Sequence, residues 1–155
     1  RMATAGAVRN GDVLTYTTAS NFSDTAGTAA ADVYWASLPS SDNRRILADD
    51  DSATTVLYAD SANVGVYDGT NAPSQAIAFV AGTTYKLVSK WSGTSTSVGL
   101  VGTVLATGSY DGAWGMSVIS IGVGDNGGTT RALYGTIRNV RLWTSALSDA
   151  QIKGL

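Results

Sequence analysis

Two glycine-rich loops carry the side chains of this sequence that are best suited to holding a sugar. The first loop, residues 109–116, reads SYDGAWGM and contains Tyr110, Asp111 and Trp114. An exposed tyrosine or tryptophan offers a flat apolar plate for the C–H face of a sugar, with an O–H or N–H at its edge. We expect Trp114 to be such a plate; the alternative is that it folds back and caps the core.

The second loop, residues 124–130, reads GDNGGTT and is followed by Arg131. Asp125 supplies a carboxylate, Asn126 an amide, and the glycines leave the backbone open to close approach. The alternative is an ordinary hairpin loop whose glycines supply positive φ angles. The predicted glycan-binding residues are therefore Tyr110, Asp111, Trp114, Asp125, Asn126 and Arg131.

An acidic stretch raises the question of a metal. Asp49, Asp50 and Asp51 could give hard oxygen ligands to calcium. Adjacent side chains on extended backbone point in different directions, however, and the spacing of an EF-hand is missing. An acidic surface turn is the preferred interpretation, so we predict no metal and no cofactor.

The residue types that are absent argue against catalysis. The chain contains no Cys, no His and no Glu, so every acidic side chain is an aspartate. This excludes disulfides, thiolate or imidazole metal sites, and nucleophilic triads that need histidine. Glycoside hydrolysis of the usual type needs two carboxylates at a defined separation. An Asp–Asp pair is left, but no spacing singles one out, and we predict a binding protein rather than an enzyme.

The loops must be positioned by many short strands. Turn signals recur at intervals of about 8–12 residues, which is typical of an all-β sandwich or barrel. Residues 21–28 are polar and are expected to form a loop. The expected strands cover residues 12–17, 31–38, 45–48, 54–59, 63–67, 75–80, 83–91, 97–101, 104–106, 118–123 and 133–143.

The end of the chain reads as a strand followed by a short helix over residues 148–155. Ser148 suits the N-cap, Gln151 completes a capping box, and Leu147 with Ile152 can form a hydrophobic staple. In the strand, strict alternation cannot place Ile137, Val140 and Leu142 all on the core face. We therefore predict a β-bulge near Arg138 or Asn139.

These C-terminal motifs carry a family resemblance. The pattern Gly-x-Ile-x-x-Val-x-Leu-Trp, followed by Ala-Leu-Ser-Asp-Ala-Gln-Ile, resembles the closing strand and helix of concanavalin A-like (laminin-G-like) jelly-roll domains. It looks most like the variant in bacteriophage and prophage fibre and spike proteins, where basic residues follow the isoleucine, as Arg138 and Arg141 do here. Shorter similarities lie at residues 9–14 and 81–86. The resemblance implies an all-β, two-sheet antiparallel jelly-roll sandwich with one short C-terminal helix.

The predicted function combines these points. The 155 residues are expected to form a single lectin-like domain, a fragment of a longer fibre or spike protein on a virion surface or outside the cell. It would bind bacterial surface polysaccharide, with the rest of the fibre and a homo-oligomer (a trimer in the parent) as partners. The alternative is a structural capping or subunit-contact module without a ligand. Arg138 and Arg141, which flank the predicted bulge, are expected to be surface or subunit-contact charges. A net charge of −2 argues against nucleic acid, and no apolar run is long enough for a membrane partner.

Overall fold

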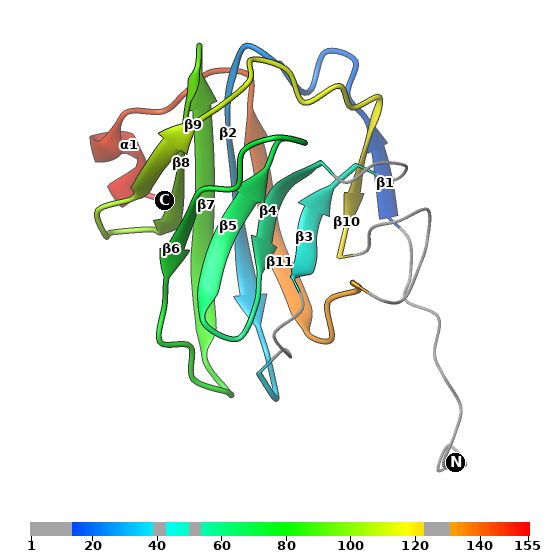
Figure 1. Cartoon of the computed structure of the whole chain (residues 1–155). Helices are drawn as coiled ribbons and strands as arrows, with labels where there is room; N and C mark the ends of the chain where they lie inside the picture. The colour runs from blue at the N-terminus through cyan, green and yellow to red at the C-terminus, as the bar shows by residue number, and fades with distance from the viewer. Residues whose placement is uncertain (1–13, 39–42, 50–53, 123–130) are drawn as a thin grey trace.

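The computed structural model describes residues 14–38, 43–49, 54–122 and 131–155, and within them the chain forms two antiparallel sheets stacked face to face (Figure 1). A short helix, α1 (Asp149–Lys153), lies beside the sheet that has five strands. This arrangement confirms the predicted all-β sandwich with one short C-terminal helix.

Each sheet brings together strands that are distant in the sequence. The six-stranded sheet has the order β1 (Leu14–Thr17), β10 (Val118–Ile121), β3 (Arg44–Ala48), β4 (Thr55–Ala59), β5 (Asn63–Tyr67) and β6 (Ser74–Ala76). The five-stranded sheet has the order β11 (Thr136–Trp143), β2 (Ala26–Tyr34), β7 (Thr84–Ser92), β8 (Ser95–Leu100) and β9 (Ala106–Ser109).

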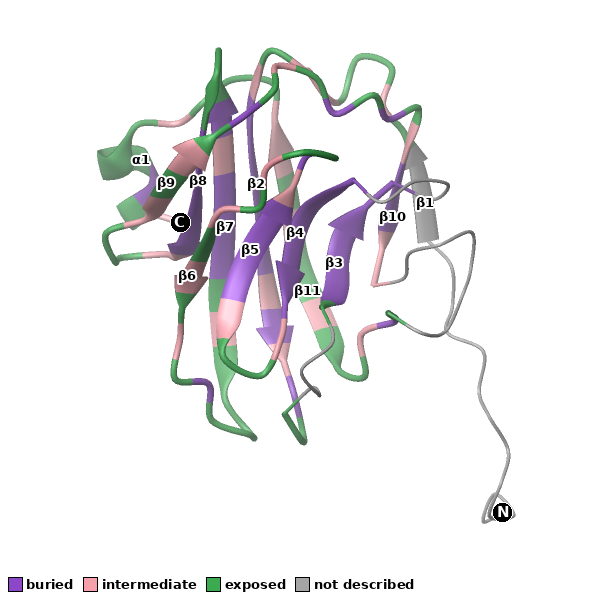
Figure 2. Ribbon diagram, viewed as in Figure 1, coloured by how far each residue is buried: buried purple, intermediate pink, exposed green. Residues whose placement is uncertain are grey.

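The core lies between the sheets and follows the alternation of the strands. On β2, Ala31 and Val33 point inward and are almost completely buried, as is Leu87 on the neighbouring β7. Buried residues follow the central strands of both layers in Figure 2. Because side chains alternate along a strand, Asp32 and Lys86 must project from the opposite, outer face of the five-stranded sheet.

The predicted bulge in the closing strand is confirmed. The register between β11 and β2 shifts between Arg138 and Arg141, and Asn139 has a φ of 51°. Val140 is therefore turned back toward the core, where it packs together with Ile137 and Leu142. The extra residue leaves Arg138 and Arg141 on the outer face.

The predicted helix cap is also confirmed. Ser148 accepts a hydrogen bond from the Gln151 amide, and the Gln151 side chain accepts one from the Ser148 amide, which completes the capping box. Leu147 and Ile152 join one small apolar cluster with Val88 on the outer face of the five-stranded sheet. The staple therefore anchors α1 to that face.

Several predicted boundaries are wrong. β2 begins at Ala26, inside the polar stretch expected to be a loop, and ends at Tyr34 rather than continuing to residue 38, while β9 covers Ala106–Ser109 instead of residues 104–106. Gly27 lets β2 lie close to Trp91, because a Cβ at this position would be 2.2 Å from the ring. Of residues 75–80, only the start belongs to a strand, β6. The chain then turns Phe79 inward against Trp35, with ring centroids 5.0 Å apart.

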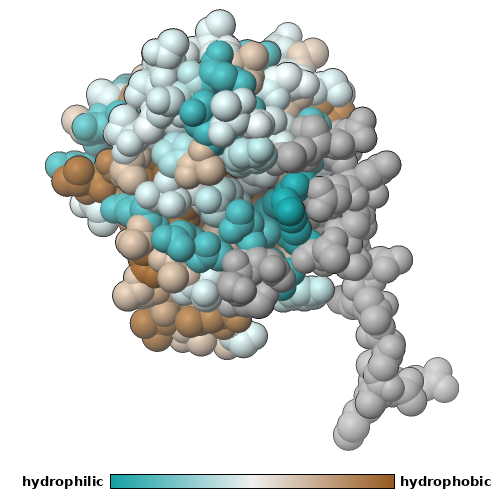
Figure 3. Space-filling view, viewed as in Figure 1, coloured by the Kyte–Doolittle hydropathy of each residue, from teal (hydrophilic) through white to brown (hydrophobic). Residues whose placement is uncertain are grey.

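The surface seen in the view of Figure 3 is mainly that of the six-stranded sheet. It mixes hydrophilic with weakly hydrophobic residues, and strongly apolar colour appears at the end where β6 connects to β7 and again at the left edge of the view. Val80, in this connection, is 60% exposed. Among the described residues, no helix has the length and apolar character needed to cross a membrane.

Candidate functional site

Basic side chains collect on the outer face of the five-stranded sheet. The helix α1 covers only part of this face, and we call the uncovered part the basic face. It consists of Asp32 of β2, Lys86 of β7, and Arg138, Asn139 and Arg141 of β11. It carries three cationic side chains and one carboxylate, in a chain whose net charge is −2.

The register of three strands sets the geometry of the basic face. Arg138 pairs with Asp32, and Asp32 pairs with Lys86 on its other side, so the acid sits in a row between two cations. Since adjacent strands lie about 4.8 Å apart, the row spans about 10 Å. Asn139, turned outward by the bulge, donates a hydrogen bond from Nδ2 to Asp32 Oδ2 at 2.7 Å.

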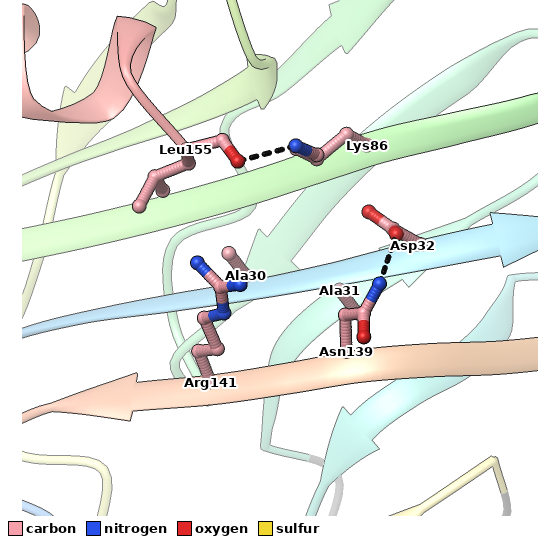
Figure 4. A pocket seen from close by; sticks show the side chains of 7 residues that line it. All are labelled: Ala30, Ala31, Asp32, Lys86, Asn139, Arg141 and Leu155. Atoms are coloured by element: carbon pink, nitrogen blue, oxygen red, sulfur yellow. Dashed lines mark hydrogen bonds between the residues drawn. The ribbon is translucent and has the colours of Figure 1, made fainter.

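A small depression lies beside this row (Figure 4). Its floor is Ala30, whose short side chain leaves room between Arg141 and Lys86. The Lys86 ammonium donates a hydrogen bond to the Leu155 carbonyl, which ties one side of the depression to the segment after α1. Its volume of about 20 Å³ is enough for one or two water-sized groups and too small for a sugar ring.

The chemistry of this depression suits one small anionic group. A guanidinium presents its N–H donors in a planar fork that matches both oxygens of a carboxylate, and such charge-assisted hydrogen bonds are the strong ones. The Asp32 carboxylate can accept hydrogen bonds from the hydroxyls of a ligand. The Asn139 side-chain amide can both accept and donate such bonds. A carboxylate with hydroxyl groups around it is therefore the ligand that these side chains fit best.

The backbone conformation of Asn139 in the bulge leads to a prediction about substitutions at this position. A φ of 51° is a left-handed conformation that glycine and asparagine tolerate and β-branched residues do not. Asn139→Val should lower the free energy of unfolding by about 1–2 kcal/mol, measured by urea denaturation. Asn139→Gly, which removes the same side chain without strain, is the matched control and should cost clearly less. Equal stability of the two variants would contradict the argument.

The prediction that Trp114 is an exposed plate is wrong. Tyr110 and Trp114 are both 2% exposed, and their rings pack against each other with centroids 5.0 Å apart. The Tyr110 hydroxyl donates to the Asp24 carbonyl at 2.6 Å, and the Trp114 amide donates to the Asp24 carboxylate. Burial is the main reason why the pKa of the Tyr110 phenol is raised. The negative charges of Asp24, Asp111 and Asp68 raise it further. The loop is held inward and caps the sandwich.

The other predicted residues are not brought together. Asp111 is exposed, and its side chain accepts from the Ala113 amide. Arg131 is also exposed, and its backbone carbonyl accepts from Arg45. Asp111 belongs to the loop after β9 and Arg131 to the segment before β11, which lie at opposite ends of the sandwich (Figure 1). Asp125 and Asn126 lie outside the described residues, and their role in sugar binding stays a prediction.

The acidic stretch considered for calcium is only partly described. Asp49 is 6% exposed and its amide donates to the Thr54 carbonyl, whereas Asp50 and Asp51 lie outside the described residues. Over residues 14–38, 43–49, 54–122 and 131–155, no group of three or more Asp side chains is arranged to hold a metal ion.

The sequence interpretation missed the basic face. Arg138 and Arg141 were expected to be surface or subunit-contact charges, and Lys86 lay inside the expected strand over residues 83–91 without an assigned role. Tyr134, 65% exposed with its ring 5.2 Å from the Arg44 guanidinium carbon, was missed as an exposed aromatic residue. A usable signal was present, because the predicted bulge already implied that two arginines share one side of β11.

No protein-family model and no curated protein sequence matches this chain. Solved structures do match it. The carbohydrate-binding module CBM40 of the Ruminococcus gnavus IT-sialidase is 16% identical, with a TM-score of 0.64, and the match covers 84% of this chain and 82% of that one. The same module has been solved bound to α2,3-sialyllactose.

Two sialidases share the fold over a small part of their length. Trypanosoma rangeli sialidase is 20% identical with a TM-score of 0.65, covering 84% of this chain but 22% of the sialidase. Streptococcus pneumoniae NanB sialidase is 11% identical with a TM-score of 0.72, covering 92% of this chain and 26% of NanB. At such identities the matches establish a shared sandwich fold, so the argument for function rests on the basic face.

Proposed function

We propose that this protein is a non-catalytic carbohydrate-binding module that holds an acidic saccharide on its basic face. The observation that carries the proposal is the depression between Lys86 and Arg141, which has the size and charge to receive a carboxylate. The CBM40 module of R. gnavus, which shares the fold, has been solved with a sialylated sugar, and this supports the same class of ligand here.

Binding without turnover fits the side chains at this site. Asp32 is the one carboxylic side chain that lines the depression, and Asn139 already donates a hydrogen bond to it. Hydrolysis of a glycosidic bond in the usual manner needs a second carboxylic group as acid or nucleophile. We therefore propose recognition with modest affinity at each site, with avidity supplied by several copies.

The test is a calorimetric titration with α2,3-sialyllactose, and with lactose as the neutral control. Wild type should bind sialyllactose and not measurably lactose. Arg141→Ala should weaken sialyllactose binding about tenfold or more, because a charge-assisted hydrogen bond contributes about 1.5–3 kcal/mol. Arg131→Ala removes an arginine from the loop predicted by sequence and should change little. Loss of binding in Arg131→Ala with normal binding in Arg141→Ala would move the site to residues 125–131 and overturn the proposal.

We further propose, from the sequence resemblance, that the module belongs to a phage-type fibre or spike on a virion surface or outside the cell. There an oligomeric parent, a trimer, would present several copies to bacterial surface polysaccharide. The proposal predicts that a trimerised form binds cells with acidic surface polysaccharide far more tightly than the single domain. Equal binding by the two forms would count against it.

A structural role is the second candidate, and one observation favours it. A module that only caps or contacts subunits needs no exposed aromatic plate, and Tyr110 and Trp114 are both buried. This role predicts that the isolated domain forms a stable oligomer whose interface covers the basic face. A monomeric solution mass together with saccharide binding would exclude it.

A further inference from the structure

A second groove lies on the outer face of the five-stranded sheet, on the far side of α1 from the basic face. It runs between α1 and the connection from β8 to β9 and has a volume of about 240 Å³. Ile152, packed on Ala30 and Val88, separates it from the depression near Lys86. A cavity near the small end of the usual range for ligand pockets can take a single sugar ring.

One wall of this groove is polar. The Ser97 and Thr107 hydroxyl oxygens lie 3.0 Å apart on paired residues of β8 and β9. Beside them, Lys90 Nζ donates to Asp149 Oδ1 at 2.5 Å. This hydrogen bond and the Lys90 charge lower the pKa of the Asp149 carboxyl, which is therefore ionised at neutral pH. The pair gives the groove donors and acceptors, and Lys153 of α1, which also lines it, adds one positive charge.

Other side chains that line this groove are apolar. Leu105 and Ile152 belong to the small cluster that anchors α1, and Val104 on the rim is 89% exposed. A groove that combines hydroxyls and an ion pair with aliphatic carbons is complementary to a pyranose ring. Such a ring presents hydroxyls at its edges and C–H groups on its faces, and the Lys153 ammonium can donate hydrogen bonds to those hydroxyls.

The two sites lie within reach of one short oligosaccharide. Lys86 lines the first site and Lys90 the second, and both project from the same face of β7. Four residues along a strand correspond to about 13 Å. A ligand with an acidic end and neutral rings would span this distance across the end of α1.

We propose that the groove lined by Lys90, Ser97, Thr107, Asp149 and Ile152 is a second saccharide subsite, which takes a neutral ring of the oligosaccharide whose acidic residue occupies the basic face. The inference rests on the proposed function for the identity of the ligand. It also explains how the module could select one oligosaccharide over another. Binding would require an acidic sugar residue and a neutral sugar residue at a fixed distance from each other.

The test compares free N-acetylneuraminic acid with α2,3-sialyllactose on the same variants. Wild type should bind the trisaccharide more tightly. Thr107→Val, which removes one hydroxyl, should weaken trisaccharide binding about three- to tenfold and leave the monosaccharide unchanged. Thr94→Val, which removes an exposed hydroxyl from the turn between β7 and β8, is the matched control and should change neither. Arg141→Ala should weaken both ligands.

The outcomes separate the two proposals. If Arg141→Ala weakens both ligands but Thr107→Val affects neither, the groove is no subsite and the basic face still stands. If Thr107→Val weakens the trisaccharide while Arg141→Ala has no effect, the groove stands and the proposed function of the basic face fails. Amide shifts in a trisaccharide titration give a check independent of folding: residues 97, 107 and 149 should move with the trisaccharide and stay fixed with the monosaccharide, and fixed signals in both titrations would overturn the inference.

Discussion

Replacing Trp91 with alanine is expected to lower the free energy of unfolding by about 3–5 kcal/mol. The indole is 1% exposed, donates its N–H to the Ser23 carbonyl at 2.8 Å, and contacts the rings of Phe22 and Trp114 at centroid distances of 5.1 and 5.4 Å. Its removal leaves a large void, and the glycine at position 27, which the ring covers, has no side chain to fill it.

Urea denaturation followed by circular dichroism measures this effect. Trp143→Ala is the matched control, because that ring is half-buried and lies in the small outer cluster with α1. It should cost clearly less than Trp91→Ala. If the two substitutions cost the same, the burial of Trp91 between the sheets does not contribute the expected stability.

Removing the carboxylate of Asp68 should cost about 3 kcal/mol. Asp68 is 4% exposed and accepts hydrogen bonds from the amides of Thr70 (2.8 Å), Asn71 (2.5 Å) and Asp111 (3.0 Å), and from the Asn71 side chain (2.9 Å). The contact with Asp111 ties the turn after β5 to the loop that carries Tyr110. Asp68→Ala leaves these donors without an acceptor, and chemical denaturation at pH 7 should show the loss.

The pH dependence of the same carboxylate gives a sharper test. Burial alone would raise the pKa of Asp68, but hydrogen bonds from Asn71, Thr70 and Asp111 outweigh it and hold the pKa below its usual value. Since the unfolded group titrates near pH 3.9, this stabilisation is complete above about pH 5 and is lost as the pH falls through the lower folded pKa. The difference in unfolding free energy between wild type and Asp68→Asn should therefore be constant above about pH 5 and shrink below about pH 4. A difference that stays constant down to pH 2.5 would contradict the role of the charge.

Much of the fold could be predicted from local signals. The capping box at Ser148 depends on residues within one helical turn, and the bulge follows from counting the apolar positions Ile137, Val140 and Leu142. Both are confirmed because neighbouring residues decide them. The jelly-roll sandwich followed from the spacing of strands and from the resemblance of the closing motif.

The sites could not be predicted in the same way, because contacts distant in sequence decide them. Trp114 stands in a glycine-rich stretch that suits a surface loop, yet it is held inward by Asp24, 90 residues away. The basic face depends on β11 lying next to β2, where Asn139 contacts a carboxylate 107 residues away. Strand alternation places Lys86 and Val88 on the same face of the strand, but it does not determine which other side chains Lys86 meets.

The inserted residue at Asn139 has a consequence for how this surface can be altered. It leaves Arg138 and Arg141 on the outer face, so these two positions can be varied without touching the inward-facing Ile137, Val140 and Leu142, whereas position 139 accepts only residues that tolerate a left-handed backbone. Deleting Asn139 would leave a strand that alternates without a bulge, with Ile137, Val140 and Leu142 still facing inward and Arg138 and Arg141 still facing outward. What the deletion removes is the amide that donates to Asp32, so the inserted residue adds a polar group to this surface without changing which side chains reach the core.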